Sequence, residues 1–147
     1  MNIFAKLSEG CATGSPMETR ELAAALARAL PPDQTLSLHG TLGVGKTTFT
    51  SGLAEGFGIQ AKVTSPTFQF YNIYESPQRQ LIHLDAYRLE NSEQANELLL
   101  EEFLHSPWCL VVEWPEQIEE WLPEPCQHIY LSIMKDKRHF IRGIFDF

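Results

Sequence analysis

The residues with the clearest chemical potential lie in one short stretch, HGTLGVGKTT at positions 39–48. Gly40, Gly45, Lys46 and Thr47 complete the pattern Gly-x-x-x-x-Gly-Lys-Thr, which is typical of a phosphate-binding loop. Glycine permits the tight turns with positive φ that gather backbone N–H groups around a phosphate. Lys46 would add positive charge near the β and γ phosphates, and the Thr47 hydroxyl could bind Mg²⁺. The pattern therefore predicts binding of a nucleoside triphosphate.

The elements around the loop agree with this interpretation. Residues 35–39 alternate as in a strand, and residues 47–57 are typical of a helix that stops at Gly58. A loop between a strand and a helix directs the helix N-terminus at the phosphates. We expect Lys46 to be exposed in this loop.

A phosphate loop that holds Mg²⁺ normally works with a second carboxylate at the end of a neighbouring strand. Glu113 ends the apolar run at 108–113 and is the favoured candidate, as a magnesium ligand or as the group that orients water. Asp85 ends the run at 80–85 and is the alternative. His83 would face the same way as Asp85. We interpret it as a hydrogen-bonded structural histidine or as a polar neighbour of the site.

A segment after the loop helix, 63–68, contains Ser65, Pro66 and Thr67. Its hydroxyl groups lie on backbone stiffened by proline. Residues 64–68 could respond to the γ-phosphate, or they could form a turn that opens a strand.

The other patterns predict an α/β fold, a three-layer sandwich like that of P-loop NTPases, with a mostly parallel central sheet and an antiparallel hairpin. Ser15 and Glu18 form a capping box before a helix at 16–30. The continuous apolar strand at 108–113 suits a parallel sheet covered on both faces. We expect one domain over residues 1–147. The remaining predicted elements are strands at 67–75, 79–85, 126–136 and 138–147, and helices at 91–106 and 115–123.

Composition restricts the function classes. The net charge of −8 is unfavourable for direct binding of nucleic acid or of a membrane surface. The three cysteines have no paired spacing, which argues against a disulfide-rich secreted protein and against a zinc site, and Cys109 has the setting of a core residue. No apolar run approaches a membrane span or a signal peptide. We expect a cytoplasmic protein.

Four motifs occur in order along the chain: HGTLGVGKTT, TSPTF, HLDAYRL and VVEW. Over residues 13–123 this set resembles the TsaE (YjeE) family of bacterial ATPases, which takes part in threonylcarbamoyladenosine formation in tRNA. The family usually has an acid where this chain has Thr41, and alanine where it has Val44. Neither difference removes a phosphate donor, because the backbone supplies the donors.

The resemblance implies binding of ATP and Mg²⁺, with weak ATPase activity alone. It also implies docking on the TsaD–TsaB pair, which transfers threonylcarbamoyl to the adenosine next to the anticodon in ANN-decoding tRNAs. The resemblance implies that this chain would contact tRNA only indirectly, through that complex.

The resemblance also assigns roles to residues. Lys46, Asp85 and Glu113 would be the catalytic groups, and Thr47 and Glu113 the magnesium ligands. Independently of the resemblance, Trp114 and Arg88 are candidates for the partner contact, because they are polar or aromatic residues close to the two acids in the sequence. Thr13, in the segment before the first helix, would lie near the adenine. The nucleotide-binding residues would be Thr13, Thr41, Leu42, Gly43, Val44, Gly45, Lys46, Thr47 and Thr48.

Three other functions share the phosphate loop. A small-molecule or nucleoside kinase would need an arginine-bearing lid, but the arginines after Glu113 are only Arg138 and Arg142. A GTPase would need an [NT]KxD motif, and the sequence MKDK at 134–137 is not one. A nucleotide-binding adaptor without catalysis stays possible, because a phosphate loop indicates binding and not rate.

Overall fold

The computed structural model describes residues 2–41, 43–66 and 69–147. It contains a seven-stranded sheet with the strand order β1-β7-β6-β2-β5-β4-β3. The strands are β1 (Cys11–Thr13), β2 (Gln34–His39), β3 (Tyr71–Glu75), β4 (Gln80–Asp85), β5 (Trp108–Glu113), β6 (Cys126–Ile133) and β7 (His139–Ile144).

The centre of the sheet is parallel and its edges are antiparallel. Strand β2 pairs in parallel with both β5 and β6, and β4 pairs in parallel with β5. The β3–β4 hairpin forms one edge, and β7 and β1 form the other in antiparallel pairing. The predicted α/β class with a mostly parallel core and an antiparallel hairpin is confirmed, and the second antiparallel edge is additional.

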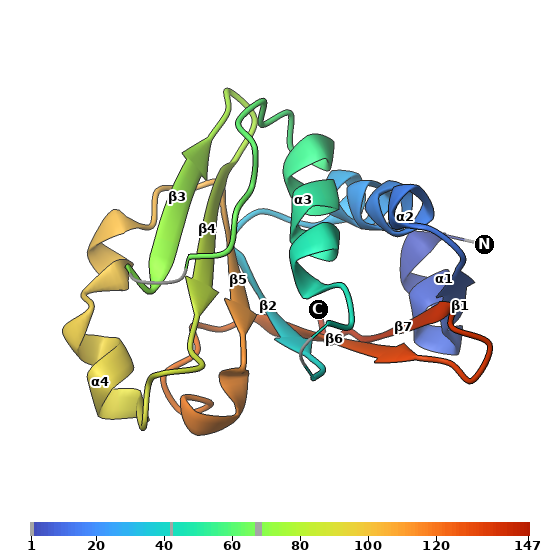
Figure 1. Cartoon of the computed structure of the whole chain (residues 1–147). Helices are drawn as coiled ribbons and strands as arrows, with labels where there is room; N and C mark the ends of the chain where they lie inside the picture. The colour runs from blue at the N-terminus through green and yellow to red at the C-terminus, as the bar shows by residue number, and fades with distance from the viewer. Residues whose placement is uncertain (1, 42, 67–68) are drawn as a thin grey trace.

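Helices cover the two faces of the sheet over different strands. One core cluster joins α1 (Ile3–Glu9), α2 (Pro16–Ala29) and α3 (Lys46–Gly56) to the sheet. On the opposite face, α4 (Ser92–Glu97) and the short 3₁₀ helix η1 (Leu100–Phe103) contribute to a second cluster over β4 and β5. Figure 1 shows α2 and α3 over one half of the sheet, and α4 at the end that carries β3.

The capping box before α2 forms as expected. The Ser15 side chain accepts from the Glu18 backbone N–H at 3.1 Å, and the Glu18 carboxylate accepts from the Gly14 N–H at 2.7 Å. Helix α3 ends at Gly56, and Gly58 follows with φ of 78°. Both helices therefore begin and end close to the predicted positions.

The helix predicted over 91–106 is wrong as a single helix. Asn91 caps α4, which stops at Glu97, and Leu99 has a left-handed backbone with φ of 56° before η1 begins. A continuous helix would place Leu100 off the face that buries Ala95. The break buries Leu100 in the second core cluster and leaves Leu99 exposed. The free energy gained by burying Leu100 therefore exceeds the cost of interrupting the helix.

The predicted helix over 115–123 is a 3₁₀ turn, η2 (Pro115–Gln117), followed by further i to i+3 turns. These turns place Ile118 and Trp121 on one side, where both contact the second core cluster. Helix α1 and strand β1 were not predicted, although Asn2 caps α1 through its side chain. Strand β3 begins at Tyr71 rather than at 67; positions 67 and 68 lie outside the described residues.

In the part of the chain that the structure describes, every helix is too short or too polar to cross a bilayer.

Close packing of α2 against α3 fixes the helix that follows the phosphate loop. A Cβ atom at Gly52 would lie 2.5 Å from the Arg20 carbonyl oxygen and 2.7 Å from the Ala23 Cβ. These contacts are too short for a side chain, so glycine is required where the two helices approach.

We predict that Gly52→Ala destabilises the fold, although alanine is the better helix former. The added methyl group must separate α2 from α3, and overpacking of this kind costs about 1–3 kcal/mol. Chemical denaturation measures the change. Ser51→Ala, one residue earlier on α3, is the matched control and should stay within about 0.5 kcal/mol of wild type. A Gly52→Ala protein more stable than wild type would contradict this packing.

Candidate functional site

The loop between β2 and α3 has the backbone that its glycines predict. Gly43 and Gly45 have φ of 80° and 99°, and Gly45 is the N-cap of α3 in a left-handed conformation. The N–H groups of the first turn of α3 therefore follow the loop directly, as a phosphate site requires. Leu42, a predicted nucleotide contact, lies outside the described residues.

Lys46 is buried, with 5% of its surface exposed, so the expectation of an exposed lysine is wrong. Its Nζ donates to the Gly40 carbonyl oxygen at 2.8 Å and lies 3.7 Å from the centroid of the Trp114 ring. Burial lowers the pKa of Lys46, while the nearby carboxylates of Glu113 and Asp85 act in the opposite direction. The Lys46 ammonium is thus surrounded by the Gly40 carbonyl oxygen, the face of the Trp114 ring and nearby carboxylates.

The two predicted acids lie at the carboxyl ends of neighbouring strands. Glu113 on β5 is in register with Asp85 on β4 and with Leu38 on β2, just before the phosphate loop. Parallel pairing brings all three strand ends to one edge. There, a cavity of about 350 Å³ is lined by Gly43, Gly45, Lys46, Thr47, Thr48, Ser65, Asp85, Glu113 and Trp114.

Glu113 is 5% exposed and makes a very short hydrogen bond to His83 through its Oε2. His83 is completely buried on β4, and its Nε2 is the partner atom. The interpretation of His83 as a hydrogen-bonded histidine beside the site is therefore confirmed. Sequence alone did not identify Glu113 as its partner.

Asp85 is more open to solvent than Glu113. Its Oδ1 accepts from the Tyr87 backbone N–H at 3.0 Å, which turns the chain directly after β4. The Tyr87 ring makes an edge contact with Trp114, with centroids 5.1 Å apart. Trp114 has a left-handed backbone with φ of 57°, directly after β5. In this conformation its ring lies over the Lys46 ammonium.

Strand β7 supports the loop through a residue that was not predicted. The Nδ1 atom of His139 lies 2.8 Å from the Val44 carbonyl oxygen. Val44, in the position where the family usually has alanine, is 4% exposed and belongs to the main core cluster. Nothing local in the sequence indicates the His139 contact, because 95 residues separate the partners.

The other predicted nucleotide contacts fall in different places. Thr48 lines the cavity, whereas Thr41 is exposed and outside its lining. Thr13 is buried, bonds to the Thr19 hydroxyl at 2.7 Å and lines a separate hollow beside α1 and α2. Thr13 on β1 nevertheless pairs with His139 on β7, the residue whose ring contacts the loop at Val44. Thr13 is therefore one strand away from that contact. Ser65 lines the cavity, while positions 67 and 68 are not described.

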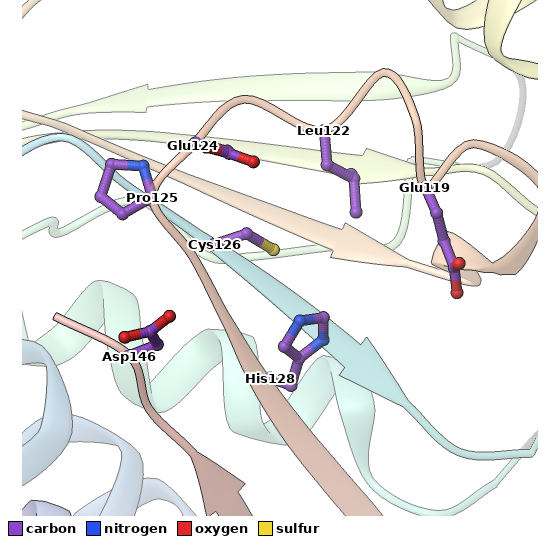
Figure 2. A pocket seen from close by; sticks show the side chains of 7 residues that line it. All are labelled: Glu119, Leu122, Glu124, Pro125, Cys126, His128 and Asp146. Carbon is purple, nitrogen blue, oxygen red and sulfur yellow. The ribbon is translucent and has the colours of Figure 1, made fainter.

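A second, larger cavity of about 740 Å³ contains none of these groups. Figure 2 shows Cys126 and His128 on β6 facing it, with Glu119 and Leu122 from the loop before β6 and Asp146 from the C-terminal segment. The Cys126 thiol and the Ser37 hydroxyl form a hydrogen bond at 3.3 Å. Burial raises the pKa of the Cys126 thiol. The glycine loop and the two acids line the smaller cavity at the strand ends, so that cavity is the candidate site.

The donors at the candidate site fit Mg²⁺. Thr47, Asp85 and Glu113 present oxygen atoms to one cavity, and oxygen is the ligand that Mg²⁺ prefers. Among the described residues no group of three or more His, Cys, Asp or Glu side chains could hold a metal by itself. The two carboxylates in the cavity lining match what Mg²⁺ usually takes, one or two carboxylates together with water and substrate phosphates.

A strand, a glycine loop ending in Gly-Lys-Thr and a helix, with acids at the neighbouring strand ends, define an α/β domain of the P-loop class. Comparison with known proteins gives the family. Residues 13–142 match the model of the family described as threonylcarbamoyl adenosine biosynthesis protein TsaE. This chain belongs to the TsaE family.

Individual relatives agree. The chain is 43% identical over 112 residues to the tRNA threonylcarbamoyladenosine biosynthesis protein TsaE of Bacillus subtilis, covering 76% of this chain and 70% of the relative. It is 42% identical over 107 residues to the protein of that name from Streptomyces coelicolor, covering 71% and 72%. The crystal structure of Bacillus subtilis YdiB superposes with a TM-score of 0.72 at 35% identity, over 90% of this chain and 81% of that one.

We predict that Lys46→Met leaves the free energy of unfolding unchanged or higher. An apolar chain of similar length fills the same space against Trp114 without the cost of burying an ammonium. Thermal or urea unfolding measures this, with Lys62→Met on the exposed loop after α3 as the control. A loss beyond about 2 kcal/mol would show instead that the ammonium contacts hold the loop together.

Proposed function

We propose that this chain binds Mg–ATP at the strand-end cavity and hydrolyses it slowly by itself. The observation that carries the proposal is the lining of one cavity by the loop residues Lys46 and Thr47 together with Asp85 and Glu113. Glycine-loop donors, one cation and two carboxylates are the parts that phosphoryl transfer to water requires.

Each group has a distinct task. Lys46 would exchange the Gly40 carbonyl oxygen for the β and γ phosphates, which carry more negative charge than a carbonyl. Thr47, with Glu113 or Asp85, would hold Mg²⁺, which supplies charge neutralisation on the phosphates. Glu113 would orient the attacking water, since its carboxylate lines the same cavity as Lys46 and Thr47.

We propose that the chain acts as a single domain in threonylcarbamoyladenosine formation in tRNA, in the cytoplasm. The family match and the named relatives support this role. The net charge of −8 favours a protein partner over direct tRNA contact. In this proposal hydrolysis is coupled to the TsaD–TsaB pair, which would meet the chain at Trp114 in the cavity lining, at Tyr87 beside it, and at Arg88, the next residue along the chain. Tyr87 is 62% exposed there, an aromatic side chain available for an interface.

The kinase alternative has less support. The arginines that follow Glu113 make contacts away from the cavity: Arg138 pairs with Asp136 at 2.8 Å, and the Arg142 Nε lies 3.4 Å from the Ser8 carbonyl oxygen. Neither lines the candidate site. A kinase would need such a cation over the transferred phosphoryl group.

We predict that Lys46→Met protein, folded as wild type, loses ATP hydrolysis by about 10²–10³-fold, because one preorganised charge on the transferred phosphoryl group is gone. Single-turnover hydrolysis of labelled ATP measures this, and displacement of a fluorescent ATP analogue by ATP or GTP measures binding. Lys62→Met is again the control. Wild-type hydrolysis by Lys46→Met protein would refute the phosphate-loop assignment, and preference for GTP would refute an ATPase.

We predict that a TsaB–TsaD pair raises the steady-state ATPase rate of the wild-type chain. A partner seated at Trp114 and Tyr87 would order the groups around Glu113 and exclude water from the cavity. Titration of TsaB–TsaD into the ATPase assay measures the effect, and Tyr87→Ala should weaken it while leaving the rate of the chain alone unchanged. Absence of stimulation and of binding in both ATP and ADP, together with phosphate transfer to a small molecule, would favour a kinase.

A further inference from the structure

One buried polar group at the site has no part in the binding of phosphate or metal described so far. His83 lies in the interior of β4 with none of its surface exposed, two residues before Asp85. An imidazole in a fully buried strand loses its hydrogen bonds to water, which costs free energy. We therefore expect a hydrogen-bond partner in the protein that offsets this cost.

That partner is the Glu113 carboxylate. On the sheet, His83 is in register with Val111 of β5, and Glu113 is two residues further along β5. The two side chains are therefore diagonal neighbours on one face of the sheet, the face that also carries Leu81 and Val111 into the core below α3. The His83 Nε2 meets the Glu113 Oε2 in a very short contact.

The other nitrogen of the ring determines which atom carries the hydrogen. His83 Nδ1 is buried and has no hydrogen-bond partner. A hydrogen on Nδ1 would leave a buried donor unsatisfied, whereas a bare Nδ1 leaves only a weaker, unfilled acceptor. The geometry therefore assigns the hydrogen to Nε2, and His83 donates to Glu113.

This donation controls where the carboxylate of Glu113 is directed. Burial lowers the pKa of Lys46, and the charge of Glu113 acts against that lowering, yet these two described side chains form no ion pair within 4.0 Å. Lys46 bonds to the Gly40 carbonyl instead. With one oxygen of Glu113 bound to His83, the carboxylate is held at the cavity and away from the ammonium.

We propose that His83 is a positioning residue that fixes the Glu113 carboxylate for its role in hydrolysis, a role that rests on the proposed ATPase function. His83 is fully buried and does not line the cavity itself. It acts as an outer partner that orients a working carboxylate, a kind of contact whose loss typically costs 10–100-fold.

Two variants separate the hydrogen bond from the volume of the ring. His83→Gln keeps an N–H donor near the position of Nε2, and His83→Met keeps a long side chain without a donor. We expect His83→Met to lower the single-turnover rate of ATP hydrolysis about 10–100-fold, with the dissociation constant for Mg–ATP close to that of wild type. His83→Gln should restore most of the rate. His105→Met, which removes an exposed histidine outside the lining of the cavity, is the control and should hydrolyse ATP as wild type does.

A double-mutant cycle tests whether His83 acts through Glu113. In a Glu113→Gln background, His83→Met should cause little further loss, because the carboxylate that it positions is already gone. Equal loss by His83→Met in both backgrounds, or equal loss in His83→Gln and His83→Met, would overturn the proposal.

Crystal structures of the nucleotide-free variants give a readout that does not depend on activity. Glu113 should leave its wild-type rotamer in His83→Met and keep it in His83→Gln. An unchanged Glu113 in His83→Met overturns the positioning role, whatever the kinetics. If instead Glu113 moves but the wild-type chain does not hydrolyse ATP even with TsaB–TsaD, the orientation of Glu113 by His83 stands and the ATPase function fails.

Discussion

Parallel pairing of β2, β5 and β4 is the constraint on which the site depends. Each of these strands is buried over almost its whole length, and the register aligns Leu38, Glu113 and Asp85 at one edge of the sheet. A register shift of one residue would turn either acid to the opposite face. The phosphate loop and two carboxylates that are distant in sequence therefore meet because the hydrophobic core fixes how the strands pair.

The site places charged and polar groups where a core would normally be apolar. Lys46, Glu113 and His83 are each at most 5% exposed, and their contacts are a carbonyl, an aromatic ring and one another. Such groups contribute little to stability, because desolvation offsets most of their attraction. Their value is electrostatic: charges fixed in place by a folded core act strongly on a phosphate.

Much of the fold and of the site follows from local pattern. The capping box, the glycine loop and the apolar strand at 108–113 are short-range signals, and each appears in the structure where it was predicted. Contacts between distant segments were not predictable in this way. The His139 support of Val44 and the pairing of His83 with Glu113 depend on strand order, which no local pattern encodes. The break at Leu99 was missed because burial of Leu100 outweighed a good helical pattern. Lys46 was placed at the surface because the Trp114 ring that covers it arrives from a turn 68 positions later.

The central claim, that the strand-end cavity holds a metal–nucleotide complex between the glycine loop and the two acids, is tested most directly by a crystal structure. The chain would be crystallised with a non-hydrolysable ATP analogue and Mn²⁺ in place of Mg²⁺, and the metal located by its anomalous scattering. The account predicts one metal peak beside the Thr47 hydroxyl and a carboxylate of Glu113 or Asp85, with the γ-phosphate against Lys46. A nucleotide bound in the cavity formed by Cys126 and His128, or phosphates that leave Lys46 on the Gly40 carbonyl, would contradict it.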